Sequence, residues 1–249
     1  MGPICGPKYN SSNRIPSLEY KWNASHKQQG LDKHKAIESW ITRTLLHPSR
    51  HSKTKGSILD LEQLGIEEHK SAWRIVVSIM VLNYDGNIED AAFLAAVAAL
   101  KDTVLPPVKT VRDVNGNEIL ALDSDFQDME LTALKEVKMR GKQIQLDCIP
   151  IPLTVGLFIM NDDEKENYKI LVDPTGQEEE VLDGIMSIVV GFPVTEEANY
   201  DLSSNHEINI LSVNKPGGKV VVTPKDIAAC MHLCQGRAQE LVPVITQIE

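Results

Sequence analysis

Residues 72–101, AWRIVVSIMVLNYDGNIEDAAFLAAVAALK, contain the pattern that decides the fold class. Ala72 to Leu82 is rich in β-branched residues and is long enough for a core strand. Asn83 to Asn87 contains an Asp-Gly pair, which is typical of a tight turn. Ile88 to Lys101 then predicts a helix that is apolar on nearly every face and therefore buried, with small side chains that let it lie close against a sheet.

The flanking sequence extends this unit in both directions. A helix is expected from Asp32 to the break at Pro48, and Thr223 with Pro224 predicts the start of a last long helix. Between residues 102 and 222 the β pattern recurs, with a hairpin turn at 114–118, and the expected strands are 144–149, 153–160, 169–172, 184–190 and 207–213. This order predicts an α+β fold, with residues 1–30 as an irregular basic arm and residues 31–249 as a single domain.

Composition restricts the class of protein. With 42% hydrophobic and 24% charged residues, the chain can bury a sizeable core. No apolar run approaches the roughly 20 residues of a membrane-spanning helix, and no secretory signal is recognisable at the start. The four cysteines are scattered and do not form a disulfide framework, so a reducing compartment, cytosol or nucleus, is expected.

The charge is distributed unevenly along the chain. Residues 1–56 carry 10 Lys/Arg against 3 Asp/Glu, a net +7, whereas residues 57–249 carry 15 against 32, a net −17. A basic arm on an acidic body suggests contact with nucleic acid or docking onto an acidic neighbour. The alternative is an arm that is merely solvated.

Three groups of residues are candidates for chemistry. Cys230, His232 and Cys234 suggest a metal site, but spacing on a helix turns His232 away from the two thiols, and buried thiols are the preferred interpretation. Cys5 with His34 or His47 is a weaker candidate for a nucleophile and its base, since no recognisable motif surrounds these residues. The basic segment 215–219, Lys-Pro-Gly-Gly-Lys, is interpreted as a turn, with phosphate binding as the alternative.

A cluster of acids is the fourth candidate. Clustered carboxylates can bind a divalent metal or act as general acid and base. The alternative, which the residues alone favour, is a loop and short helix that expose the acids to water. The cluster consists of Asp173, Glu178, Glu179, Glu180 and Asp183.

Several segments resemble a known family. Residues 82–92, LNYDGNIEDAA, resemble the strand–turn–helix of RNase PH-type domains. Residues 170–180, ILVDPTGQEEE, are similar to the Val-Asp-Pro-Thr-x-x-Glu-Glu segment of the eukaryotic exosome's ring subunits. Residues 3–9 and the run from Lys215 to Met231 resemble parts of one member of that group.

The resemblance implies an RNase PH-like fold of the ribosomal protein S5 domain 2-like type, with its N-terminal strands incomplete. The motif match starts well inside the family domain, and its Arg-Pro-Asp-Gly-Arg entry has no counterpart in this sequence. It implies a place in a six-membered ring of RNase PH-like subunits, with RNA-binding cap subunits and RNA as partners. It also implies nucleus, nucleolus and cytoplasm as locations.

The same resemblance bears on catalysis. Phosphorolytic relatives carry a second Asp twelve positions after the one that matches Asp173, and here that position is Ile185. Asp183 would lie on the same strand face as Ile185 but displaced along it. We therefore expect a non-catalytic subunit with no cofactor or metal, and the phosphorolytic exoribonuclease is the alternative. By resemblance to the pore side of the ring, Lys8 and Arg14 are the expected RNA contacts.

Overall fold

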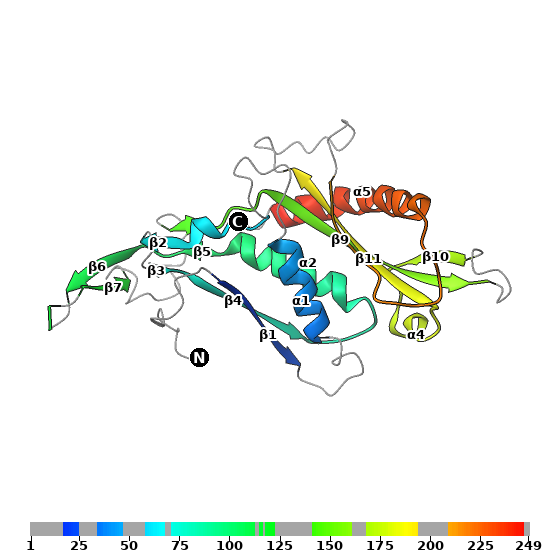
Figure 1. Ribbon diagram of the computed structural model, residues 1–249, viewed down its shortest axis with the longest axis horizontal. Coiled ribbons are helices and arrows are strands. Elements are labelled where there is room, and N and C mark those ends of the chain that lie inside the picture. The colour runs from blue at the N-terminus through cyan, green and yellow to red at the C-terminus, as the bar shows by residue number, and fades with distance from the viewer. Residues whose placement is uncertain are drawn as a thin grey trace.

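The computed structural model describes residues 17–24, 34–46, 58–67, 71–112, 115–116, 118–122, 141–160, 168–193 and 209–246. Figure 1 shows an elongated molecule, with the β6–β7 hairpin at one end and β10 and α4 at the other. In chain order the elements are β1 (Ser17–Ala24), α1 (His34–Leu45), η2 (Leu61–Leu64), β2 (Gly65–Glu67), β3 (Ser71–Ala72), β4 (Arg74–Val81), α2 (Ile88–Asp102), β5 (Val104–Leu105), β6 (Val108–Arg112), β7 (Glu118–Leu122), β8 (Lys142–Gln143), β9 (Cys148–Ile159), β10 (Tyr168–Val172), α4 (Gly176–Glu179), β11 (Gly184–Pro193), β12 (Asn209–Asn214) and α5 (Pro224–Thr246).

The main sheet is antiparallel and has the strand order β10-β9-β11-β12. β9 and β11 are paired along the whole of β11, and Thr154 lies directly opposite Ser187 in this register. Helices α2 and α5 both pack against β9, and α5 also contacts β11. The α+β prediction is confirmed, and β9 has both α2 and α5 packed against it.

β9 is one continuous strand, whereas the sequence analysis predicted two strands on either side of residues 150–152. Two prolines caused the error, because a proline lacks the N–H that a central strand donates. Pro150 and Pro152 pair with β11 on one side, but β10 pairs only with residues 155–159, so β9 is still an edge on its other side at the prolines. Thr154 follows Pro152 on the same side of β9, and its N–H donates to the side chain of Asp90 instead of a neighbouring strand.

β1 and β4 form a separate parallel pair, with Ser17 opposite Arg74 and Ala24 opposite Val81. A parallel pair needs a crossover connection, and α1 lies between the two strands in sequence. The expectation of an irregular segment over residues 1–30 is therefore wrong for residues 17–24. The sequence does alternate there, with Leu18, Tyr20 and Trp22 between polar residues, and the sequence analysis overlooked this signal of a strand. Only the pairing with β4 is a tertiary contact.

The helix predicted from residue 88 is present as α2, but it is not buried on nearly every face. Ala92, Phe93, Ala96, Val97 and Leu100 are buried, while the alanines at 91, 95 and 99 are exposed. The buried positions recur at helical spacing, so one face of α2 covers the core and the other faces solvent. An alanine-rich sequence hides this difference, because alanine occurs on both faces.

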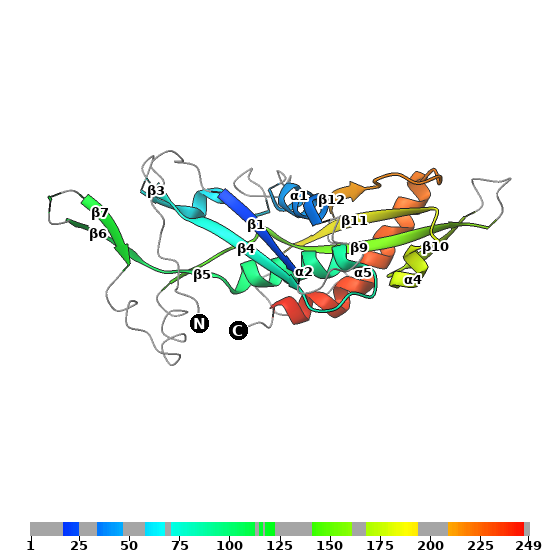
Figure 2. The same cartoon turned by 90° about the horizontal axis from the view of Figure 1, so that it is seen from below.

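The other helices follow their predicted patterns. α1 buries Ile37, Trp40, Ile41 and Leu45, and the Trp40 ring lies 5.1 Å from the ring of Phe93 on α2. α5 begins with Pro224 as predicted and continues through Pro243. The β6–β7 hairpin surrounds the predicted turn and extends away from the body in both views (Figures 1 and 2). Within the described residues no helix combines the length and apolarity needed to cross a membrane.

Candidate functional site

Two of the sequence motifs meet at the turn before α2. Gly86 has φ +89°, and a Cβ built on it would lie 2.5 Å from the carbonyl carbon of Thr175 and 2.6 Å from the nitrogen of Gly176. The carbonyl oxygen of Pro174 is nearer still. Only glycine allows this approach, because it accepts positive φ and has no Cβ. The Asp-Gly turn and the Asp-Pro-Thr segment thus pack backbone against backbone.

The glycine-rich segment at 215–219 packs against the backbone of Asp183. Gly218 has φ +92°, and a Cβ there would lie 2.5 Å from the carbonyl oxygen of Asp183. The N–H of Lys219 donates to that same oxygen over 2.9 Å, and its Nζ lies 3.7 Å from the Asp183 carboxylate. The segment is a turn, as predicted, and its lysine pairs with an acid of the same fold.

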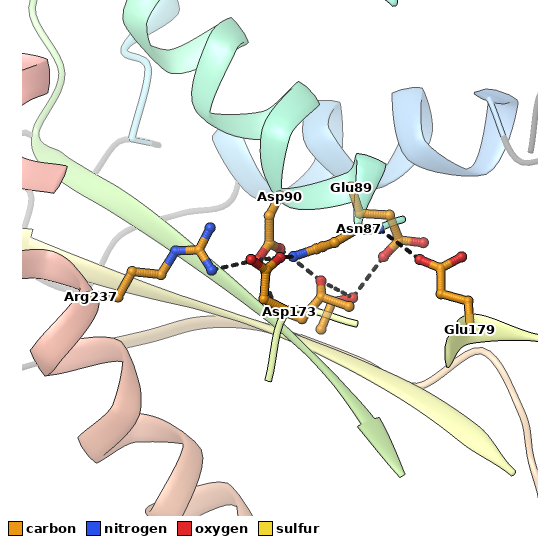
Figure 3. A network of polar contacts seen from close by, with 8 residues as sticks. Asn87, Glu89, Asp90, Asp173, Glu179 and Arg237 are labelled. Atoms are coloured by element: carbon orange, nitrogen blue, oxygen red, sulfur yellow. Dashed lines mark hydrogen bonds and ion pairs between the residues drawn. The ribbon is translucent and has the colours of Figure 1, made fainter. Parts of the chain in front are cut away.

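Asn87 is the centre of a polar network at the start of α2 (Figure 3). Its side-chain Nδ2 donates both to Asp173 Oδ1 and to Asp90 Oδ2, the latter over 3.1 Å. Asn87 has φ 43° and Asp173 has φ 56°, a left-handed conformation that Asn and Asp tolerate better than most residues. Asn87 Oδ1 is buried and has no hydrogen-bond partner among the described residues. One amide thus bridges two carboxylates from segments far apart in the sequence.

Asp90 is the most deeply buried acid of the network, with 1% of its surface exposed. Its Oδ2 accepts the Thr154 N–H over 3.0 Å and lies 3.3 Å from Nη1 of Arg237 on α5. Its Oδ1 accepts the Thr154 hydroxyl over 2.7 Å. Burial raises the pKa of Asp90, while the Thr154 hydroxyl, the Arg237 charge and the Asn87 amide act in the opposite direction. A buried carboxyl needs such partners. Through its bonds to Thr154 and Arg237, Asp90 connects α2 to β9 and α5.

The network continues from Thr154 across the sheet. Thr154 Oγ1 lies 3.0 Å from Ser187 Oγ on β11, and the Ser187 hydroxyl donates to Glu89 Oε2 over 2.7 Å. Thr154 and Ser187 are both fully or almost fully buried. Glu89 and Asp90, adjacent on α2, are therefore linked through two hydroxyls that belong to two different strands.

Glu179 of α4 ties the acid-rich segment to the turn before α2. Its two carboxylate oxygens accept from the Asn87 N–H and from the Tyr84 hydroxyl, each over 2.8 Å. Burial and the hydrogen bond to Glu179 raise the pKa of Tyr84 to about 12. Glu178 forms a capping box with Thr175, and the Thr175 N–H and hydroxyl lower the pKa of the Glu178 carboxyl. Of the predicted acidic cluster, Glu178 and Glu179 are therefore structural, and Glu180 is exposed.

The residues that would carry phosphorolysis do not fit a divalent cation. Ile185 presents an aliphatic side chain, and the carboxylate of Asp183 accepts the Ile159 N–H over 2.9 Å while facing Lys219. In the part of the chain that the structure describes, no three His, Cys, Asp or Glu side chains are grouped as metal ligands. We therefore derive no metal-dependent step from these side chains.

The remaining candidates lie elsewhere. Cys230 and Cys234 are fully buried in the stripe of α5 that faces the core, and His232 is exposed, as helical spacing predicted. Burial raises the pKa of both thiols, that of Cys234 to about 12, so both stay protonated at neutral pH. Lys8, Arg14, Cys5 and His47 fall outside the described residues, as does the side chain of His34.

The sequence analysis named Asp173 and Glu179 but missed six members of the network: Asn87, Glu89, Asp90, Thr154, Ser187 and Arg237. A polar residue between apolar neighbours was the only available signal for Thr154 and Ser187, in strands that otherwise bury aliphatic side chains. Arg237 had no local signal, because its partner is contributed by another helix. The sequence could place each of these residues on an element but could not bring them together.

Comparisons with known proteins agree with this geometry. The chain matches the model of the 3′ exoribonuclease family, domain 1, over residues 6–106 and that of domain 2 over residues 148–236, together about three quarters of its length. The domain 1 match begins far before the motif at residue 82, and the expected N-terminal incompleteness is not confirmed. The network of Figure 3 joins α2, in the first matched region, to β9, β11 and α5 in the second.

Individual relatives are distant. The chain is 24% identical to the exosome complex component RRP45 of Danio rerio over 83% of this chain and 42% of that protein. It is 28% identical to Rrp42 of Methanothermobacter thermautotrophicus over 74% of this chain and 53% of that protein. The chain thus spans about half the length, or less, of these curated relatives.

Solved structures show the same fold. An archaeal exosome core chain superposes with a TM-score of 0.58 at 20% identity, covering 97% of this chain and 73% of that one. Rice Rrp46 superposes with a TM-score of 0.52 at 16% identity, covering 99% and 79%. With both domain models matched in order and the fold shared, the chain belongs to the RNase PH-like 3′ exoribonuclease family.

Proposed function

We propose that this chain is a non-catalytic structural and RNA-path subunit of an RNA exosome ring. In that role it supports 3′-to-5′ RNA processing and decay, including rRNA maturation. The observation that carries the proposal is Ile185, which occupies the position where the family resemblance places the second acid of the phosphorolytic site. An aliphatic group neither binds a divalent cation nor transfers a proton.

The bonding of the nearby acids supports the same proposal. Asp173 accepts from Asn87, Glu179 accepts from Asn87 and Tyr84, and Asp183 accepts from the Ile159 N–H. Each of these carboxylates thereby holds two segments of the fold together. Arg237, the guanidinium in the network, faces Asp90 and so compensates a buried charge. The acids stabilise the domain in this arrangement, and a ring subunit requires such stability without requiring chemistry.

A phosphorolytic 3′-to-5′ exoribonuclease is the second candidate, favoured by the name of the matched family. The test is incubation of the chain, alone and in a reconstituted ring, with labelled single-stranded RNA, magnesium and phosphate. We expect no nucleoside diphosphate above a mock preparation. Release that is abolished by Asp173→Asn but kept in Asp147→Asn, an exposed control, would establish the enzyme instead.

The proposed partners are other RNase PH-like ring subunits, RNA-binding cap subunits and RNA. Within the family, residues 3–9 and the segment from Lys215 to Met231 resemble ribosomal RNA-processing protein 43, and we propose that the chain occupies the corresponding place. Nucleus, with nucleolus, and cytoplasm are the proposed locations. Purification of the tagged chain followed by mass spectrometry should recover the other ring subunits, and their absence would contradict the proposal.

The proposed RNA contacts are Lys8 and Arg14 in the basic N-terminal segment. Contacts between basic side chains and phosphate release counterions, so binding should weaken steeply as salt is raised. Crosslinking of RNA to the assembled ring should fall in Lys8→Ala with Arg14→Ala. It should persist in Lys35→Ala with Arg43→Ala, which removes the same charges from the exposed side of α1. Equal crosslinking in both double variants would assign the segment to contact with a neighbouring subunit.

A further inference from the structure

The chain of oxygens between Asp90 and Glu89 contains more contacts than its hydroxyl protons can serve. Asp90 Oδ1, Thr154 Oγ1, Ser187 Oγ and Glu89 Oε2 follow one another at 2.7, 3.0 and 2.7 Å. Each of these three contacts is at hydrogen-bonding distance and needs one proton. Thr154 and Ser187 supply one proton each.

The deficit follows from the chemistry of the end groups. A carboxylate only accepts, so with both ends ionised Thr154 donates to Asp90 and Ser187 donates to Glu89. The central contact between the two hydroxyl oxygens would then have no proton, and two lone pairs would face each other in a buried site. A single proton on either carboxyl removes this conflict, because every hydroxyl can then donate in the same direction along the chain.

We propose that the chain Asp90–Thr154–Ser187–Glu89 holds one additional proton in the folded protein at neutral pH. The proton belongs to the hydrogen-bonded chain as a whole. In an unfolded chain at neutral pH both carboxyls are ionised. Folding therefore takes up one proton at this site.

The surroundings of the pair are consistent with an uptake of one proton. Arg237 and Cys234 face Asp90 from α5, Asn87 and Asp173 face it from the turns, and Glu179 and Tyr84 lie at the start of α2 near Glu89. The Cys234 thiol and Tyr84 hydroxyl are neutral at pH 7, since their pKa values are both about 12. Arg237 therefore contributes a single positive charge against two acids of the chain and their acidic neighbours, Asp173 and Glu179. Burial also raises the pKa of Asp90.

The pH dependence has a definite sign. A site that is protonated when folded and ionised when unfolded contributes stability that is lost as the pH rises through the folded-state pKa. One proton taken up on folding lowers the folding equilibrium constant by about tenfold for each pH unit of increase. Other groups of the protein add their own slopes, so the comparison must be made between variants.

Glu89→Gln is the informative variant because an amide mimics the protonated acid. Its NH₂ group donates to Ser187 permanently, so every contact of the chain is satisfied without uptake of a proton. Urea unfolding of the full chain should show a wild-type dependence on pH, between about pH 5 and pH 8, that is steeper than that of Glu89→Gln by up to tenfold per pH unit. The variant should be the more stable of the two at the alkaline end. Glu240→Gln, an exposed glutamate of α5, is the matched control and should follow the wild type.

Ser187→Ala provides a second test that does not depend on mimicry. Without the Ser187 hydroxyl, the only remaining contact is between Thr154 Oγ1 and Asp90 Oδ1, and the Thr154 hydroxyl proton satisfies it. The extra dependence of stability on pH should therefore disappear, although the variant is less stable. Infrared spectroscopy of the native chain should also show the C=O band of a protonated carboxyl at neutral pH, and Glu89→Gln should remove it. Parallel pH curves for wild type and Glu89→Gln, or no such band in the wild type, would overturn the proposal.

Discussion

Replacement of Gly86 by alanine should loosen the contact between the turn before α2 and the segment 174–176. The new methyl group would overlap three backbone atoms, one from each of Pro174, Thr175 and Gly176. Backbone atoms cannot rotate away as the end of a side chain can. The two segments would have to separate, and this would also stretch the bonds from Asn87 to Asp173 and Glu179.

The magnitude has two parts. Alanine at a left-handed φ costs about 1–2 kcal/mol relative to glycine. Overpacking in a close contact typically adds about 1–3 kcal/mol. Gly86→Ala should therefore lower the free energy of unfolding by about 2–5 kcal/mol. That is a large part of the stability of a typical domain, which is about 5–15 kcal/mol.

Gly116→Ala separates the two parts. Gly116 lies in the β6–β7 turn with φ +84°, close to the +89° of Gly86, but a Cβ there meets no atom within 4 Å. In this control the free energy of unfolding should fall only by the cost of alanine at positive φ, about 1–2 kcal/mol. Urea unfolding followed by far-UV circular dichroism gives both values. Equal losses in the two variants would refute the argument that backbone contact between the motifs stabilises the domain.

Two further predictions concern charge and association. Arg237→Leu removes the countercharge of Asp90 and should lower the free energy of unfolding at neutral pH by about 3 kcal/mol, the low end for a broken buried pair because the Arg237 side chain keeps 23% exposure. A loss equal to that of exposed Arg43→Leu would contradict this prediction. The chain expressed alone should self-associate, since Met80, Leu82 and Val181 have 62%, 79% and 64% of their surface exposed, and a cleanly melting monomer in analytical ultracentrifugation would show that it is self-sufficient.

Local pattern was sufficient for most elements of this protein. The β-branched run of β4, the Asp-Gly turn and the apolar period of α2 each depend on neighbours within a few residues, and the start of α5 follows from Thr223 and Pro224. The resemblance of the motifs also indicated the RNase PH-like fold, which the family models and the superpositions support.

The tertiary structure alone decided the continuity of β9, the pairing of β1 with β4 and the network around Asn87. Prolines at 150 and 152 are compatible with β9 because β10 does not reach them, and this depends on a strand that comes later in the chain. Asp90 is an ordinary acid in the first turn of a helix until Thr154 and Arg237 surround it. Burial, hydrogen bonding and proton sharing are properties of atoms brought together from distant parts of the chain, so no local window of sequence contains them.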